Sequence, residues 1–175
     1  MRSPRREIWG VGLVALSLGA SLVALIAACG SGGHSDDPDS LPNHLRAHVV
    51  RAVDGDTALV RLGGRTEYVR YIGVDTPETV KPDTPVQCFG PQASAFDHRL
   101  VDDRTVRLDF DREREDAYGR LLAYVHAGGR FINAALVRAG FARTLSIAPN
   151  TAHAGLFARL AERAARRGRG LWGRC

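Results

Sequence analysis

Lysine is almost absent from this chain of 175 residues: Lys81 is the only one among 24 basic residues. Cysteine is also scarce, with three residues, and no Cys/His cluster has the spacing of a zinc site. No internal repeat is found. The formal charge is +5, and it falls to +3 without residues 1–29, which hold three arginines and one glutamate. A net charge this small is not enough to bind nucleic acid by overall electrostatic attraction, so a nucleic-acid partner would need a local basic patch.

The arginine bias itself has two readings. Arginine makes forked contacts to phosphate more readily than lysine, which suits a nucleic-acid partner. A bias of arginine over lysine also follows from genomic base composition, and composition alone does not separate the two.

The first 29 residues have the pattern of an export segment. Arg2, Arg5 and Arg6 precede an uncharged apolar run over residues 8–28, and Cys29 follows directly. This pattern resembles a bacterial lipoprotein signal, in which Cys29 would be lipidated and become the new N-terminus. The alternative is an uncleaved transmembrane anchor, because the run is long enough to span a bilayer. In both cases we expect an exported domain, and the first case predicts a lipid anchor on the outer face of the cytoplasmic membrane.

Residues 30–44 are rich in glycine, serine, aspartate and proline, and they predict a flexible linker. The remaining residues, 45–175, are enough for one domain with one hydrophobic core. The chain therefore divides into a signal segment, a linker and a single domain.

Apolar residues in the domain follow strand and helix periods in turn. We expect strands at 45–53, 57–62, 65–72, 105–110 and 121–126, and helices at 91–101, from about 132 to Gly140, and at 151–167. Residues 73–90 hold three prolines and predict a long loop, while Leu171 and Trp172 should fold back onto the core. The order predicts an α+β protein: an OB-fold five-stranded β-barrel with three packed helices.

Three short segments carry the chemistry. Residues 70–79 (RYIGVDTPET) supply Arg70, Asp75 and Glu78, the turn at residues 54–57 supplies Asp56, and a Tyr-Gly-Arg run supplies Arg120. Taken singly, each is most often a turn residue or a solvated side chain. Together, the carboxylates can hold a hard metal ion, two arginines can grip a phosphate, and a further carboxylate can activate water. The combination favours cleavage of a phosphodiester.

These segments belong to a longer pattern that resembles the staphylococcal nuclease (thermonuclease) family. The matching motifs lie at 49–57, 70–79, 89–96, 118–125, 133–140 and 170–172, so the resemblance covers residues 45–172. It implies an OB-fold nuclease that depends on Ca²⁺, acts on DNA and RNA, and is a monomer. The competing interpretation is a catalytically weak OB module that binds nucleic acid, although such modules have typically lost catalytic residues.

The resemblance also implies a role for each residue of the site. Asp56 and Asp75 would bind Ca²⁺ through their carboxylates and Thr76 through its carbonyl. The catalytic positions would be Arg70, Glu78 and Arg120, and Tyr118 would contact substrate phosphate.

The chain departs from the family pattern around the nucleotide. Leu145 and Ile147 stand where tyrosines line the nucleotide pocket, and Ala117 replaces a lysine. We therefore expect weaker or differently shaped nucleotide binding with the chemistry intact. Cys88, in the loop of the site, and Cys175, at the C-terminus, form either a disulfide, which export would permit, or two free thiols.

Overall fold

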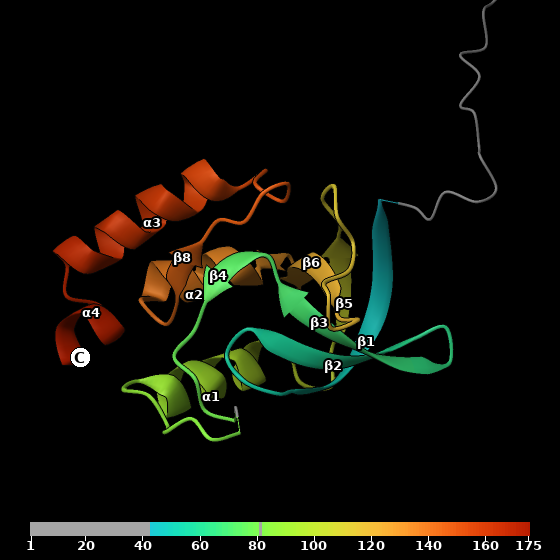
Figure 1. Ribbon diagram of the computed structural model, residues 1–175, viewed down its shortest axis with the longest axis horizontal. Helices are drawn as coiled ribbons and strands as arrows, with labels where there is room; N and C mark the ends of the chain where they lie inside the picture. The colour runs from blue at the N-terminus through green and yellow to red at the C-terminus, as the bar shows by residue number, and fades with distance from the viewer. Residues whose placement is uncertain (1–42, 81) are drawn as a thin grey trace, which may run out of the picture. The chain divides into compact units, whose positions relative to one another are not determined.

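The computed structural model describes residues 43–80 and 82–175 (Figure 1). The expected signal segment, Cys29 and nearly all of the expected linker lie outside the described residues. Within the part of the chain that is described, no helix is long and apolar enough to cross a membrane.

Five strands close into a barrel, as the sequence predicts. The sheet order is β3-β2-β1-β5-β6-β7, and an additional pairing of β3 with β6 joins the two sides. The strands are β1 (His44–Ala52), β2 (Thr57–Leu62), β3 (Arg65–Tyr71), β5 (Thr105–Asp109), β6 (Leu121–Ala127) and the short β7 (Arg130–Phe131). The β3–β6 pair is parallel, with Arg70 opposite Leu122, and every other pair in this sheet is antiparallel. The predicted OB-type barrel is confirmed.

Alternation along the strands fills the barrel. In β1, Ala47 and Val49 are buried, as are Ala58 and Val60 in β2, while the residues between them are more exposed. Successive side chains of a strand point to opposite faces, so this period of two places one face of each strand in the core. The expected strand limits agree with the observed ones to within one residue.

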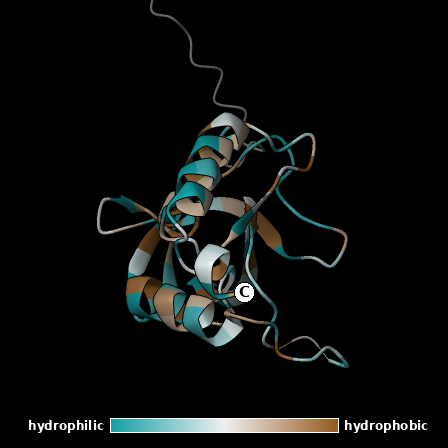
Figure 2. Ribbon diagram, turned by 90° about the vertical axis from the view of Figure 1, so that its left-hand side faces the viewer, coloured by the Kyte–Doolittle hydropathy of each residue, from teal (hydrophilic) through white to brown (hydrophobic). Residues whose placement is uncertain are grey.

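Helices α1 (Gly90–Val101), α2 (Ile132–Ala139) and α3 (Ala154–Arg166) are the three expected helices, and a short α4 (Leu171–Arg174) follows. Figure 2 shows hydrophilic and hydrophobic residues side by side along α3, at the top of the view, as an amphipathic surface helix requires. The helix α3 begins at Ala154, three residues later than expected, and α2 ends at Gly140, whose φ of 78° favours glycine.

The buried side of α1 differs from the expected one. The helical period places Phe96 and Leu100 inside, but they are only partly buried. The fully buried line is Ala93, Asp97 and Val101, spaced four residues apart. An aspartate in the core needs a partner, and the hydroxyl of Tyr71 donates a hydrogen bond of 3.0 Å to Asp97 Oδ2.

The expected loop at 73–90 begins with a strand. Residues Gly73–Asp75 form β4, which pairs antiparallel with β8 (Arg143–Leu145), and the register sets Asp75 opposite Arg143. The loop proper therefore starts at Thr76. This two-stranded sheet brings the segment after α2 beside the segment after β3.

A disulfide joins Cys88 to Cys175, with the two Cα atoms 5.9 Å apart. It links the loop before α1 to the last residue of the chain. Leu171 of α4 is buried, and its amide donates to the carbonyl of Gly140, so the C-terminal segment packs on the core as expected.

Candidate active site

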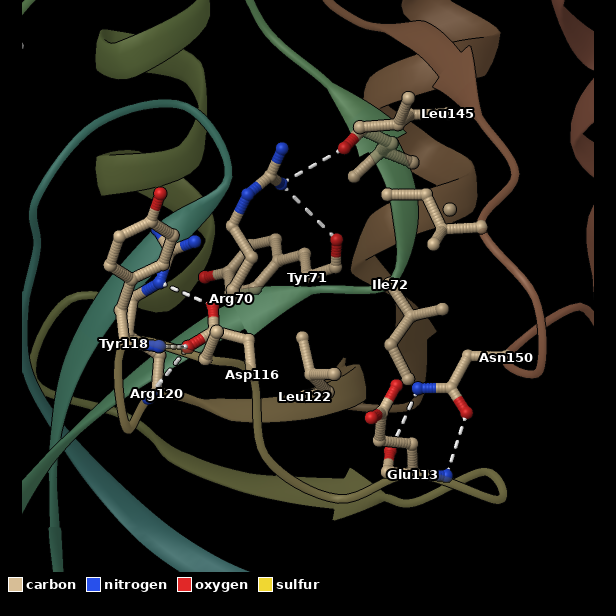
Figure 3. Close-up of a pocket in the computed structure, with 14 residues that line it drawn as sticks. Arg70, Tyr71, Ile72, Glu113, Asp116, Tyr118, Arg120, Leu122, Leu145 and Asn150 are labelled. Atoms are coloured by element: carbon tan, nitrogen blue, oxygen red, sulfur yellow. Dashed lines mark hydrogen bonds and ion pairs between the residues drawn. The ribbon is translucent and has the colours of Figure 1, made fainter.

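A cavity of about 470 Å³ opens where β3 meets β4 and β6 (Figure 3). Arg70 and Arg120, which are 50 positions apart in the chain, both line it. Its other lining residues are Tyr71, Ile72, Gly73, Val74, Glu113, Asp116, Ala117, Tyr118, Leu122, Leu145, Ile147 and Asn150. The two arginines that the sequence singles out thus face one space.

Arg70 is held by its own strand and the turn after it. Its Nη1 donates to the carbonyl of Val74 at 2.9 Å and to that of Tyr71 at 3.2 Å, the two bonds drawn in Figure 3. The same guanidinium lies between two carboxylates: Nη1 is 3.0 Å from Asp56 Oδ1, and Nη2 is 3.3 Å from Asp75 Oδ1. A planar fork with several fixed acceptors has little freedom, so Arg70 is preorganised at the cavity wall.

Asp56 is the buried member of this group, with 5% of its surface exposed. Its Oδ2 accepts from the Thr76 amide at 2.7 Å and from the Thr76 hydroxyl at 3.0 Å. Burial raises the pKa of Asp56 to about 6, although the Arg70 cation acts in the opposite direction. Because burial makes the ionised carboxylate of Asp56 costly, a further cation nearby would stabilise it.

The three expected metal ligands do converge. Asp56 and Asp75 meet at the Arg70 guanidinium, and Thr76 is bonded to Asp56. All the donors are oxygens, which is the chemistry that Ca²⁺ prefers. Over residues 43–80 and 82–175, no group of three or more His, Cys, Asp or Glu side chains could hold a metal. Two carboxylates and a threonine thus offer oxygen atoms alone, and this donor chemistry is compatible with Ca²⁺.

Arg120 is oriented by Asp116, a residue that the sequence analysis missed. Arg120 Nε lies 2.7 Å from Asp116 Oδ2, and the amides of Arg120 and Tyr118 both donate to Asp116 Oδ1. Partial desolvation acts to raise the pKa of Asp116, but these hydrogen bonds outweigh it, and the pKa is lowered. The available signal was an aspartate four residues before the arginine in a Gly-containing turn.

The departures from the expected pocket form one wall of this cavity. Leu145 is 39% exposed, Ile147 is 61% exposed, and Ala117 is also among the lining residues. Tyr118 is 86% exposed, with the Arg120 guanidinium 5.6 Å from its ring centroid. Leu145, Ile147 and Ala117 therefore give the cavity an aliphatic part, and Tyr118 is its exposed aromatic residue, because Tyr71 is buried.

Glu78 does not line this cavity. Its Oε1 accepts from the amides of Thr79 and Val80, at 2.8 and 2.9 Å, so the carboxylate folds back on its own loop. The Glu78 amide donates to Gln87 Oε1 at 3.0 Å, and its carbonyl accepts from the Gln87 amide at 2.9 Å. Of the expected catalytic residues, Arg70 and Arg120 line this cavity together, and Glu78 is not among its lining residues.

Asn150 closes the opposite side of the cavity and was also missed. Its Oδ1 accepts from the Glu113 amide at 2.8 Å, and its Nδ2 donates to the Glu113 carbonyl at 2.7 Å (Figure 3). This pair of bonds fixes the segment that carries Asp116 to Arg120 against the segment that carries Ile147. A lone asparagine beside a proline gives no sequence signal for that role.

Comparisons with known proteins bear on this geometry. The family model described as staphylococcal nuclease homologue matches residues 68–174. The chain is 44% identical over 126 residues to a protein named thermonuclease from Staphylococcus intermedius, covering 72% of this chain and 75% of that protein. It is 46% identical over 108 residues to the thermonuclease of Staphylococcus hyicus, covering 62% and 64%. It is 42% identical over 120 residues to endonuclease YncB of Bacillus subtilis (strain 168), covering 67% and 56%.

Proposed function

Because the chain belongs to the staphylococcal nuclease homologue family, we propose that it is a nuclease that hydrolyses phosphodiester bonds of DNA, RNA or both. The observation that carries the proposal is that Arg70 and Arg120 line one cavity, with the carboxylates of Asp56 and Asp75 against the first of them. Two forked cations beside two carboxylates can bind a phosphodiester and a metal ion at the same place.

Arg70 and Arg120 bind the scissile phosphate in this proposal. Each guanidinium donates in a fork, and its hydrogen bonds strengthen as negative charge gathers on the phosphoryl oxygens in the transition state. Both side chains are already positioned, Arg70 by backbone carbonyls and Arg120 by Asp116, so little reorganisation is needed when substrate enters. Tyr118 is exposed beside Arg120, and we propose that it contacts substrate phosphate.

We propose Ca²⁺ as the cofactor, held by Asp56, Asp75 and the Thr76 carbonyl. When bound, the ion would neutralise phosphate charge and orient the scissile group. The support from the structure is the all-oxygen donor set and the buried, hydrogen-bonded position of Asp56.

Glu78 is proposed to orient or deprotonate the attacking water. It is two residues from Thr76, on the loop that starts at the site. Its Oε1 accepts hydrogen bonds from the amides of Thr79 and Val80. Geometry in a free enzyme often tightens only when substrate binds, so this position is compatible with the role.

Plasmid cleavage tests the function directly. The purified full-length chain should cut plasmid DNA or an RNA transcript when Ca²⁺ is present, and a calcium chelator should stop the cutting. Arg120→Ala should remove the activity, while Arg107→Ala, in an exposed ion pair with Asp109 on β5, should retain it. Binding without cutting would favour the alternative, a nuclease-like module that holds nucleic acid.

The place of action is a separate proposal. We propose that the enzyme acts outside the cytoplasm as a monomer, anchored to the membrane by a lipid on Cys29. Metabolic labelling with a radioactive fatty acid should mark the full chain and not the Cys29→Ser variant. Equal label in the two proteins would contradict the anchor.

A further inference from the structure

We propose that the Cys88–Cys175 disulfide, acting through Gln87, is a positioning element for Glu78 and so sets the catalytic rate of the site. The inference rests on the proposed nuclease function, because it assigns the disulfide a part in that reaction. It goes beyond the function by assigning a role to residues that are neither metal ligands nor phosphate contacts.

Beyond Thr79, the described part of the loop before α1 has little packing of its own. Among its described residues from Pro82 to Cys88, all but Thr84 are exposed, and Val80 and Val86 are 54% and 61% exposed. Few buried apolar contacts and solvent-exposed backbone are the marks of a segment that opens easily. Residues 76–79 are half-buried and lie against Gly90 at the start of α1, so it is the exposed stretch after them that needs a further hold.

Two links supply that hold. Gln87 and Glu78 bond reciprocally: the Glu78 amide donates to Gln87 Oε1, and the Gln87 amide donates to the Glu78 carbonyl. The next residue is Cys88, which is bonded covalently to Cys175. Glu78 is thus one hydrogen-bonded pair and one peptide bond away from the cysteine that is joined to the C-terminus of the chain.

The far end of this connection is anchored in the fold. The Cys175 amide donates to the Leu171 carbonyl, and the Leu171 side chain is buried. In the same segment the ring of Trp172 lies under the Arg143 guanidinium at 4.9 Å, and Arg143 belongs to β8. The disulfide therefore ties the loop to a segment that is itself fixed.

The disulfide lies beside the proposed metal ligands. A second cavity, of about 180 Å³, is lined by both cysteines and Gln87, together with Asp75, Thr76 and Arg143. The register of β4 and β8 already sets Asp75 opposite Arg143. The disulfide thus completes a closed series of contacts. The loop after Asp75 is bonded to the C-terminal segment, this segment contacts Arg143 of β8, and Arg143 lies opposite Asp75.

A double-mutant cycle in the full-length chain tests the positioning role. Its four proteins are the wild type, Cys88→Ser/Cys175→Ser, Glu78→Gln, and the combination, each measured for kcat and KM on a fluorogenic oligonucleotide. Removing the disulfide should lower kcat by about 10- to 100-fold, the scale of a misplaced catalytic group, with KM within about threefold. In the Glu78→Gln background the same removal should change kcat by less than about twofold, because the group that the disulfide positions is already lost.

Gln87 gives a test that leaves the disulfide intact. Gln87→Ala should lower kcat, whereas Gln87→Glu, which keeps an oxygen to accept the Glu78 amide, should restore most of it. Hydrogen exchange supplies a readout apart from activity: the Glu78 amide should exchange faster in Gln87→Ala and in the cysteine double variant than in the wild type. The Gln87 variants test the positioning role even if the cysteine double variant folds poorly.

The possible results distinguish failure of the positioning role from failure of the proposed nuclease function. A wild type that cuts no nucleic acid overturns the proposed nuclease. A wild type that cuts, with kcat unchanged on loss of the disulfide or of the Gln87 side chain, overturns only the positioning role. Equal falls in kcat with and without the Glu78→Gln substitution would also overturn it, because the disulfide would then act through another residue.

Discussion

The two arginines of the cavity should respond differently to removal, although both are needed for cleavage. Arg70 is 14% exposed at its side chain and pairs with Asp56, which is 7% exposed. Arg120 is 33% exposed and pairs with Asp116 four residues away in a surface turn. We compare Arg70→Ala with Arg120→Ala, and use Arg107→Ala as the surface control.

The structure sets the expected size of each effect. Breaking a buried ion pair costs about 3–5 kcal/mol, and we expect about 3 kcal/mol for Arg70→Ala because Asp56 keeps its two bonds from Thr76. For Arg120→Ala we expect less than about 1 kcal/mol, as for an exposed pair. Each variant loses a donor to the developing charge, so kcat should fall about 100- to 1000-fold in both.

Urea unfolding and oligonucleotide cleavage measure the two effects separately. Arg107→Ala should stay within about 1 kcal/mol of the wild type in stability and retain its cleavage rate. If Arg70→Ala were as stable as Arg120→Ala, the description of a buried Arg70–Asp56 pair would be refuted. If Arg120→Ala cut at the wild-type rate, the assignment of the cavity as the active site would be refuted.

Three further predictions test single features of the structure. Burial raises the pKa of Asp97 well above its usual range, so its contribution to stability is present at low pH and lost as the pH rises through the native value. Asp97→Asn should therefore gain free energy of unfolding relative to the wild type in alkaline buffer, and a pH-independent difference would contradict this. Ile147→Tyr should lower KM for a single-stranded oligonucleotide about tenfold by stacking on a base, and an unchanged KM in steady-state kinetics would place the base elsewhere. Gly140→Ala should unfold at lower urea than Gly129→Ala, because both have positive φ but only at Gly140 would the new methyl group meet a backbone carbonyl, that of Arg169. Equal midpoints would show that this contact relaxes freely.

The parts of the fold that could be predicted are those with a local signal. The β-rich run at 57–62 lies between the turn residues 54–56 and 63–64, and it gave β2 its observed limits because both signals are local. The pairing of β4 with β8 has no such signal, because three residues from one segment meet three from another about 70 positions away. The pairing is a tertiary event, and only the folded chain reveals it.

The same division holds for the site. Asp56 and Asp75 could be foreseen together because each follows an expected strand, and Arg70 stands near the end of the expected strand at 65–72. The burial of Asp97 could not be foreseen. A helical aspartate is normally solvated, and this one on α1 is buried against Tyr71 of β3. The position of Glu78 could not be foreseen either, because its loop is held by tertiary contacts, such as the bonds to Gln87 and the Cys88–Cys175 disulfide.

The closure of the barrel has a consequence for when the chain can act. Arg70 lies on β3 and Arg120 directly before β6, and these strands meet only through the parallel pairing of residues 69–71 with 121–123. A chain still being synthesised, or held unfolded for transport across a membrane, has the two arginines 50 residues apart and no shared cavity. In the proposed nuclease, competence to cut therefore requires the β3–β6 pairing that closes the barrel.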